Sequence, residues 1–139
     1  MLAIADVRAH DSSVAYNFVT ADRAQRFLLP PDMADWLPED HLAWFVIDVV
    51  DAIDLDRFRR SYRDDGHGRP AYDPSMMVGL LLYSYCSGVR SSRVIERRCL
   101  EDVAFRVLAG GHRPDNVTIA RFRQRHADAL AAVFVDSLR

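Results

Sequence analysis

The sequence predicts an all-α fold, a compact bundle of five or six helices with a helix-turn-helix-like C-terminal part. Two observations indicate this. Apolar residues recur at helical spacing in several segments of the 139-residue chain, and almost no segment shows the alternation of a strand. One segment, 73–88, is apolar on nearly every side, which is typical of a helix at the centre of a bundle. The length suits a single domain with a moderate core.

The first 26 residues lack periodicity and are predicted to form a loosely ordered N-terminal arm, with a helical domain over 27–139. Three prolines in LLPPDMADWLP prevent a continuous helix there. The segment PEDHLAWFVIDVVDAI then begins with Pro38 and two acids, which suit a first helical turn. An amphipathic helix is predicted from its apolar residues at helical spacing, Leu42, Phe45, Val46, Val49, Val50 and Ile53.

A short helix, LDRFRRSYR, is predicted next, with Asp56 as its cap and the turn DDGHGRP after it. Asp73 and Pro74 then suit the start of the apolar central helix, SMMVGLLLYSYC.

Three further segments follow Gly88. The first, SSRVIERRCL, has Ser91 or Ser92 as its cap, and the second, EDVAFRVLA, has acids in its first turn. The pair of glycines at 110 and 111 is typical of a helix C-terminus. The last helix is predicted to run as one long element from about Thr118 onward.

The side chains of this last helix divide by their spacing. One side, mostly apolar, is marked by Ile119, Phe122, His126, Leu130, Val133 and Ser137. Thr118, Arg121 and Arg125 share a neighbouring polar side. Arg123 falls on the opposite flank, where it is expected to cover the core edge or pair with an acid.

Charge is distributed unevenly along the chain. Residues 1–56 hold three arginines against eleven acids, a net charge of −8, and residues 57–139 hold fifteen arginines against nine acids, a net charge of +6. All eighteen basic residues are arginine, which binds phosphate and guanine through two hydrogen bonds at once. GC-rich codons would also favour arginine, so the asymmetry between the halves is the stronger indication of nucleic-acid binding.

A basic final helix, opened by Asp, Asn and Thr and packed among short helices, is the arrangement that a helix-turn-helix reader of DNA requires. Thr118 and Arg121 would lie nearest the base edges in the major groove. The roughly seven residues before this helix exceed the short turn of a standard motif. The DNA-binding residues that this arrangement predicts are Arg90, Arg93, Arg97, Arg98, Thr118, Arg121 and Arg125.

The blocks WLPEDHLAWFV, GRPAYDP, GVRSSRVIERR and PDNVTIARFR together resemble the N-terminal domain of InsH-like bacterial insertion-sequence transposases, over roughly residues 17–136. The resemblance implies a helical domain that binds the terminal inverted repeats of the element as double-stranded DNA. It also implies an attached ribonuclease-H-like domain, whose two aspartates and glutamate hold two metal ions for strand transfer. The chain stops at Arg139, before such a segment, so no catalytic position is carried over and no enzyme activity is expected. The DNA-binding role is carried over to Arg121, Arg123, Arg125 and the SSRVIERR helix.

The other sequence patterns do not indicate a catalytic, metal-binding or cofactor-binding site. Asp48, Asp51 and Asp54 recur every three residues but look like the solvated back of an apolar helix. The two cysteines and five histidines lie too far apart in sequence for a metal site, and no P-loop or catalytic triad pattern is present. Accordingly, no metal and no cofactor are predicted. Without a signal peptide or a long apolar run, a soluble cytoplasmic protein with no membrane partner is expected.

Two alternatives remain beside DNA recognition. Trp36, Trp44, Phe45 and the acidic first half can form a homodimerisation surface, since acidic surface repels DNA, or the same aromatic side chains can be ordinary core. The chain can also be a truncated remnant of a transposase, without function or acting as a competitor that occupies the element ends.

Overall fold

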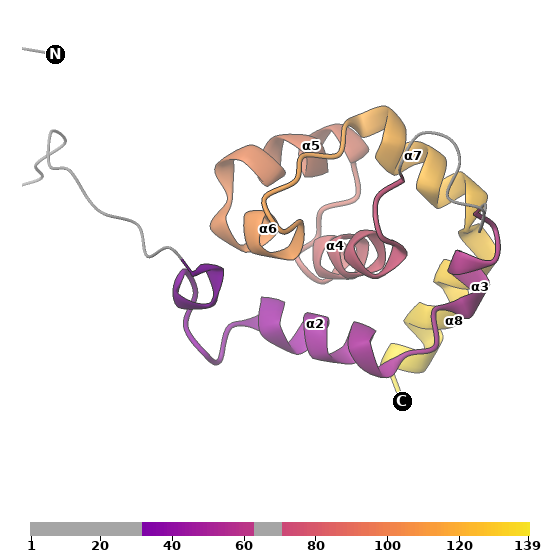
Figure 1. The fold of residues 1–139 in the computed structure, drawn as a ribbon, viewed down its shortest axis with the longest axis horizontal. Helices are drawn as coiled ribbons and strands as arrows, with labels where there is room; N and C mark the ends of the chain where they lie inside the picture. Colours follow the sequence, from indigo (N-terminus) through magenta and orange to yellow (C-terminus); the bar gives the residue numbers. More distant parts are fainter. Residues whose placement is uncertain (1–31, 63–70) are drawn as a thin grey trace, which may run out of the picture. The chain divides into compact units, whose positions relative to one another are not determined.

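The helix α4 (Pro74–Cys86) forms the centre of the molecule, as its all-round apolarity predicts (Figure 1). The computed structural model describes residues 32–62 and 71–139, so the predicted arm over 1–26, residues 27–31 and the turn around 64–70 lie outside the described residues. Within the described ranges there are seven α-helices, five of them ten residues or longer, one short 3-10 helix η1 (Met33–Asp35), and no strand. The prediction of an all-α fold is confirmed.

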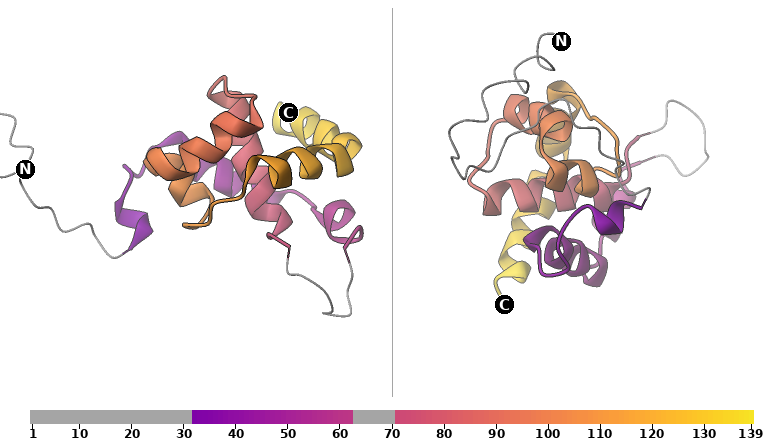
Figure 2. Two further views of the ribbon diagram at one scale, coloured as in Figure 1. Left: turned by 90° about the horizontal axis from the view of Figure 1, so that it is seen from above. Right: turned by 90° about the vertical axis from the view of Figure 1, so that its left-hand side faces the viewer.

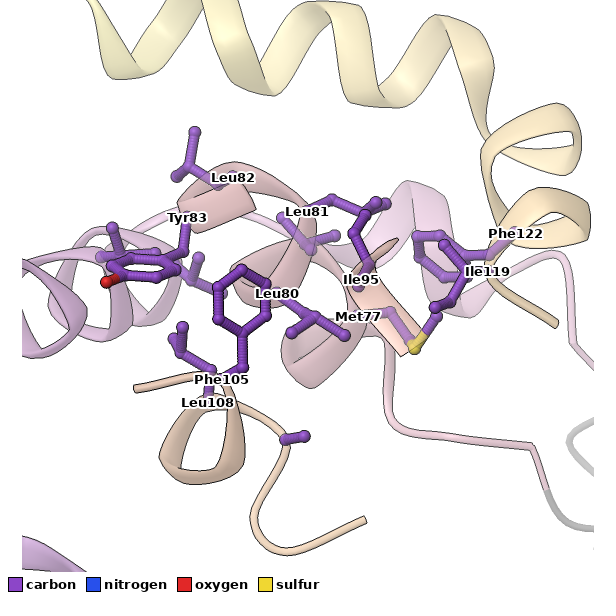
Figure 3. Packing of buried hydrophobic residues seen from close by; sticks show 14 of the residues in the cluster. Met77, Leu80, Leu81, Leu82, Tyr83, Ile95, Phe105, Leu108, Ile119 and Phe122 are labelled. Atoms are coloured by element: carbon purple, nitrogen blue, oxygen red, sulfur yellow. The ribbon is translucent and has the colours of Figure 1, made fainter. Parts of the chain in front are cut away.

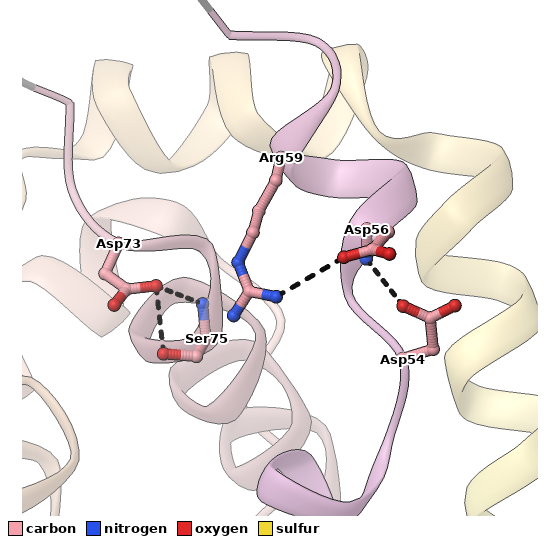
Figure 4. Close-up of polar contacts among 5 residues, drawn as sticks. All are labelled: Asp54, Asp56, Arg59, Asp73 and Ser75. Carbon is pink, nitrogen blue, oxygen red and sulfur yellow. Dashed lines mark hydrogen bonds and ion pairs between the residues drawn. The ribbon is translucent and has the colours of Figure 1, made fainter. Parts of the chain in front are cut away.

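The central helix is buried without interruption from Met77 to Ser84. Its start matches the sequence prediction, because Pro74 is the first residue and the Asp73 carboxylate accepts a hydrogen bond from the Ser75 backbone N–H at 2.9 Å (Figure 4). Figure 3 shows side chains from its successive turns contacting apolar side chains of the later helices, among them Ile95, Phe105 and Ile119. Because it packs on several sides at once, α4 fixes the helices around it.

The helix α2 (Leu42–Ala52) starts later than the sequence indicates. Pro38 does not lie in its first turn: residues 38–41 form a turn in which the His41 N–H donates to the Pro38 carbonyl at 3.1 Å. The His41 ring then caps the helix, since its Nδ1 accepts a hydrogen bond from Ala43 N–H at 3.1 Å.

The burial of α2 also differs from the predicted stripe. Ala43, Val46 and Val50 are buried where α2 packs on α4 and α6. Leu42 and Phe45, which the spacing assigns to the buried side, are instead exposed. Spacing alone cannot separate them, because α2 carries apolar residues on two adjacent faces and only one faces the bundle.

After α2, the short helix α3 (Asp56–Arg59) buries Phe58. Asp56 is not its cap, contrary to the prediction. It is the first helical residue, and the carboxylate of Asp54 accepts the hydrogen bond from its N–H at 2.9 Å, while Asp56 itself pairs with Arg59 at 3.7 Å (Figure 4).

Two helices follow in the predicted segments. Ser91, rather than Ser92, caps α5 (Ser92–Glu101). The acids that the sequence placed in the first turn of the next helix lie before it, because Glu101 ends α5 and Asp102 caps α6 (Val103–Leu108). Gly110 and Gly111 have positive φ angles of 57° and 80°, a backbone conformation that favours glycine and ends α6.

The predicted long final helix is two helices, α7 (Asn116–Arg125) and α8 (Ala127–Ser137). The break is at His126, where φ and ψ are −117° and 24°. Its ring is only 3% exposed, with ring centroids 5.0 Å from Phe58 and 4.5 Å from Phe122. The prediction failed because the apolar spacing continues across the break: Phe122, His126, Leu130 and Val133 are all buried.

Figure 2 shows the same helices from two further sides, with α8 at an angle to α7. Pro31–Arg139 form one compact unit. Among the helices of residues 32–62 and 71–139, none is long and apolar enough to cross a membrane.

Candidate nucleic-acid interface

The start of α7 is anchored on α5 by a carboxylate. Glu96 Oε2 accepts hydrogen bonds from the backbone N–H and the side-chain amide of Asn116, at 2.9 and 2.7 Å. Asp115 caps the same helix end, accepting from Thr118 N–H at 2.7 Å. Two acids therefore already occupy the N–H groups at the positive end of α7, so an added phosphate would have to bind arginine side chains instead.

The same glutamate lies beside the buried Cys99. Burial, together with the negative charge of Glu96, raises the pKa of the Cys99 thiol to about 11. The thiol therefore stays protonated at neutral pH, when it is an apolar packing group rather than a nucleophile.

A groove runs along one side of α7. It has a volume of about 730 Å³ and is bounded by α7, the end of α3, the residues before and at the start of α4, and the segment before α7. Its lining consists of Tyr62, Ala71, Tyr72, Asp73, Met76, His112, Asp115, Val117, Thr118, Arg121, Phe122 and Arg125. Thr118, Arg121 and Arg125 do share one side of α7, as the helical spacing predicts.

Arg121 is an exposed cation of this groove that no other described side chain engages. Its side chain makes no hydrogen bond or ion pair with the residues of 32–62 and 71–139, and Val117, one turn earlier, is also exposed. An uncommitted guanidinium on a helix surface can bind guanine or phosphate without first breaking a contact.

Arg125 lines the same groove but is held by Ser61 and Tyr62, just after α3. Its guanidinium lies over the Tyr62 ring, 4.2 Å from the centroid, and Nη2 donates a hydrogen bond to the Ser61 carbonyl. Binding DNA through Arg125 would break both contacts, so its position favours a structural role.

Arg123 points away from the groove, as predicted. Nη1 donates to the Arg90 carbonyl, and the guanidinium lies over the Tyr85 ring at 5.4 Å. Its Nε and Nη2 are buried and have no hydrogen-bond partner among the described residues. Arg123 thus covers the edge of the core, where it ties α7 to the segment between α4 and α5, and it is not paired with an acid.

The four arginines of the α5 region differ from one another. Arg90 and Arg93 are exposed, and their side chains have no hydrogen bond or ion pair within the described part of the chain. Arg97 pairs with Glu101 at 4.0 Å and Arg98 with Asp102 at 3.8 Å. The first pair is the more exposed, and such a pair contributes only about 0–1 kcal/mol, so Arg97 is readily released to another anion. Arg98 is half-buried beside Phe105.

At the break between α7 and α8, His126 joins an aromatic cluster with Phe58, Phe122 and Tyr62. Its Nε2 lies 3.2 Å from the Tyr62 hydroxyl. Burial lowers the pKa of His126, and the positive charge of Arg125 lowers it further. Burial likewise raises the pKa of Tyr62, although Arg125 opposes that effect. Both groups are therefore neutral at neutral pH.

The sequence does not indicate several residues of this region. Glu96 and Tyr72 lie in blocks that carry the family resemblance, but nothing in the sequence distinguishes them there. Like Tyr62 and His112, they reach α7 or the groove only through contacts between distant segments. The acids that the sequence did single out, Asp48, Asp51 and Asp54, are exposed on or after α2. Residues 32–62 and 71–139 contain no group of three histidines, cysteines or acids placed to hold a metal ion.

Comparison with known proteins shows which family this helical domain resembles. The chain matches no curated protein and no solved structure. The sequence profile of one family, described as Transposase domain (DUF772), matches residues 31–125, more than half of the chain and all of the helices from η1 to α7. Such domains are found in the N-terminal part of insertion-sequence transposases, and no catalytic domain is identified in these 139 residues. The chain therefore belongs to the family of the Transposase domain (DUF772) and has a role related to transposition.

Proposed function

We propose that this domain binds the terminal inverted repeats of an insertion element as double-stranded DNA. In this proposal α7 enters the major groove, where Arg121 contacts a base edge and Thr118 lies beside it. Arg90, Arg93 and Arg97 neutralise phosphates on the adjacent backbone. One observation carries the assignment: Arg121, Arg90 and Arg93 are exposed and uncommitted, whereas the neighbouring Arg123 and Arg125 are held by carbonyls and aromatic rings.

The geometry between α5 and α7 supports the two roles. The two helices pack against each other, and the bonds from Asn116 to Glu96 fix the start of one helix on the other (Figure 1). A backbone contact made through α5 would therefore set the position of α7 in the groove, as phosphate contacts do in DNA-binding proteins.

The α6–α7 pair is the candidate for the helix-turn-helix-like part. Seven residues, 109–115, connect these helices, more than the three or four of a standard motif. The proposal therefore requires only that α7 presents its exposed side to DNA and does not depend on the standard turn.

The test compares three single variants on two duplexes, one carrying the inverted repeats that flank the gene and one with the same bases scrambled. Arg121→Ala should weaken binding to the repeat by about 1–3 kcal/mol and affect the scrambled duplex much less. Arg93→Ala should weaken both similarly and lower the slope of log K against log salt by about 0.9, because one fewer counterion is released. Arg139→Ala, at the exposed end of the chain, is the matched control for lost charge and should change the difference between the duplexes little.

Equal and weak binding of the wild type to both duplexes, unchanged by Arg121→Ala, would contradict the proposal. The domain alone is also expected not to cleave or join DNA with Mg²⁺ or Mn²⁺, because strand transfer needs a set of metal-binding carboxylates. A strand-transfer product from pure protein would contradict that expectation.

A further inference from the structure

The helix α2 has a second apolar face that the bundle does not cover. Leu42, Phe45 and Ala52 are exposed on it, and Val49, which lies between them at helical spacing, is half-buried against the core. Phe45 is 64% exposed and Leu42 43% exposed, whereas the adjacent face of the same helix is buried. Exposed acids, Asp48 and Asp51, flank this face. We call Leu42, Phe45, Asp48 and Asp51 the α2 surface.

A second exposed apolar patch lies where α5 ends and α6 begins. Leu100 is 51% exposed and Val103 is 42% exposed. Arg93, Arg97 and Leu100 fall on one side of α5 at spacings of four and three residues, and all three are exposed. This patch thus combines apolar side chains with the charges of Arg93 and Arg97, and a partner acid would have to replace the exposed pair between Arg97 and Glu101. We call Arg93, Arg97, Leu100 and Val103 the α5 surface.

The two surfaces match in chemistry but lie on different sides of the molecule. Figures 1 and 2 show α2 and α5 on opposite sides of α4, and α2 packs on α4 and α6 whereas α5 packs on α6 and α7. The outer face of α5 and the acidic outer face of α2 therefore point away from each other within one chain. Any contact between the two surfaces must join two copies.

We propose that the α2 surface of one copy binds the α5 surface of another. Leu42 and Phe45 pack on Leu100 and Val103, while Asp48 and Asp51 face Arg93 and Arg97. These two arginines bind phosphate in the proposed function, so the contact between copies and the phosphate contacts are alternatives at Arg93 and Arg97. A symmetric contact of α2 with α2 fits less well, because it brings Asp48 and Asp51 of one copy towards the same acids of the other. The partner is a second copy of this chain, because each chain carries both the α2 surface and the complementary α5 surface.

This contact uses different patches on the two partners, so each copy can bind one neighbour on each side. Such a contact produces a growing series of species unless the arrangement closes into a ring. Its strength should depend on salt, because exposed charges take part.

The experiment uses sedimentation or light scattering of the purified chain over a range of concentrations. The wild type should associate beyond a dimer as its concentration rises, and less so at high salt. Phe45→Asp removes one half of the contact and Leu100→Asp removes the other, so each variant alone should be monomeric. Their equimolar mixture should give a 1:1 dimer and nothing larger, because only one intact surface of each kind remains.

Three further variants guard against misfolding and unspecific effects. Asp48→Arg and Arg97→Asp, both at exposed positions, should each raise the dissociation constant about tenfold or more, since like charges would then face each other. Val135→Asp, at an exposed apolar position on α8, is the matched control and should associate like the wild type. Circular dichroism checks that each variant keeps its helices.

Several results would overturn the proposal. A wild type that stays monomeric at every concentration would do so, as would a Leu100→Asp variant that associates like the wild type. A mixture of Phe45→Asp and Leu100→Asp that remains monomeric while both variants are folded would also contradict it.

Discussion

The outer face of α7 and its last turn use the same residue type in different ways. On the outer face Arg121 is exposed and has no partner among the described residues. In the last turn Arg125 is fixed on Ser61 and Tyr62, next to the buried His126 and the stacked rings of Phe58 and Phe122. We call this second region, formed by Phe58, Ser61, Tyr62, Phe122, Arg125 and His126, the α3–α7 junction. The difference shows that neighbours distant in sequence decide whether an arginine is available to a ligand.

We expect the largest loss of stability when an aromatic ring is removed from the α3–α7 junction. Phe58 is 1% exposed and contacts Phe122 and His126, so Phe58→Ala should lower the free energy of unfolding by about 3–5 kcal/mol. Val117→Ala, on the outer face, is the control and should change it by less than about 0.5 kcal/mol. Urea denaturation measures both. Similar small effects would mean that the junction does not stabilise the fold.

The anchoring of α7 on α5 can be tested next. Glu96→Ala removes the acceptor of two hydrogen bonds from Asn116 and should lower the free energy of unfolding by about 1.5–3 kcal/mol. Glu101→Ala, on the same helix, breaks only an exposed ion pair and should cost less than about 1 kcal/mol. If both variants unfold at the same urea concentration, the Glu96 contact is no stronger than a surface pair.

A smaller difference should separate Arg123 from Arg121. Arg123→Met loses a hydrogen bond to the Arg90 carbonyl and the contact with Tyr85, but it also removes two buried N–H groups that lack partners. The net loss of stability should therefore be only about 1 kcal/mol. Arg121→Met should lose less than about 0.5 kcal/mol, because the side chain is exposed. Thermal unfolding measures both variants. A lower melting temperature for Arg121→Met than for Arg123→Met would contradict the structural role of Arg123.

The smallest expected effect is a pH dependence that belongs to the α3–α7 junction. Burial, together with Arg125, lowers the pKa of His126 below its ordinary value of 6.5. The unfolded chain therefore binds the proton more readily than the folded one, so the His126 contribution is complete above about pH 6.5 and is lost as the pH falls through the folded-state pKa.

Urea denaturation at several pH values between about 8 and about 5 measures this loss. His126→Gln should reduce the slope of stability against pH in that range. A slope that is the same in the wild type and in His126→Gln would assign the pH dependence to other groups.

These features also show how far the sequence alone could predict the molecule. The caps at Asp73 and Ser91 could be predicted because each depends on residues within three positions. The break at His126 could not, because the ring is held by Phe58 and Tyr62, more than sixty residues earlier in the chain. The apolar spacing across the break is that of an unbroken helix, so the sequence pattern does not indicate the break.

The candidate site, too, could be predicted from the sequence only in part. Helical spacing correctly placed Thr118, Arg121 and Arg125 on one side of α7. It could not show that Arg125 is held by Ser61 and Tyr62, because the contact joins residues 64 positions apart in sequence. The exposure of Phe45 was equally hidden, because an apolar residue at helical spacing fits a core and an interface alike.

The separation in sequence of the contacts at α7 implies an order of folding. The bonds between Glu96 and Asn116 close a loop of 20 residues, whereas those from Arg125 and His126 to Ser61 and Tyr62 close loops of 64. Shorter loops cost less entropy to close, so we expect α5 and α7 to pair first and the α3–α7 junction to form last. During synthesis Phe58 leaves the ribosome well before Phe122 exists. Its ring must therefore remain without this partner until α7 has been made, and an exposed aromatic ring favours misassembly during that time.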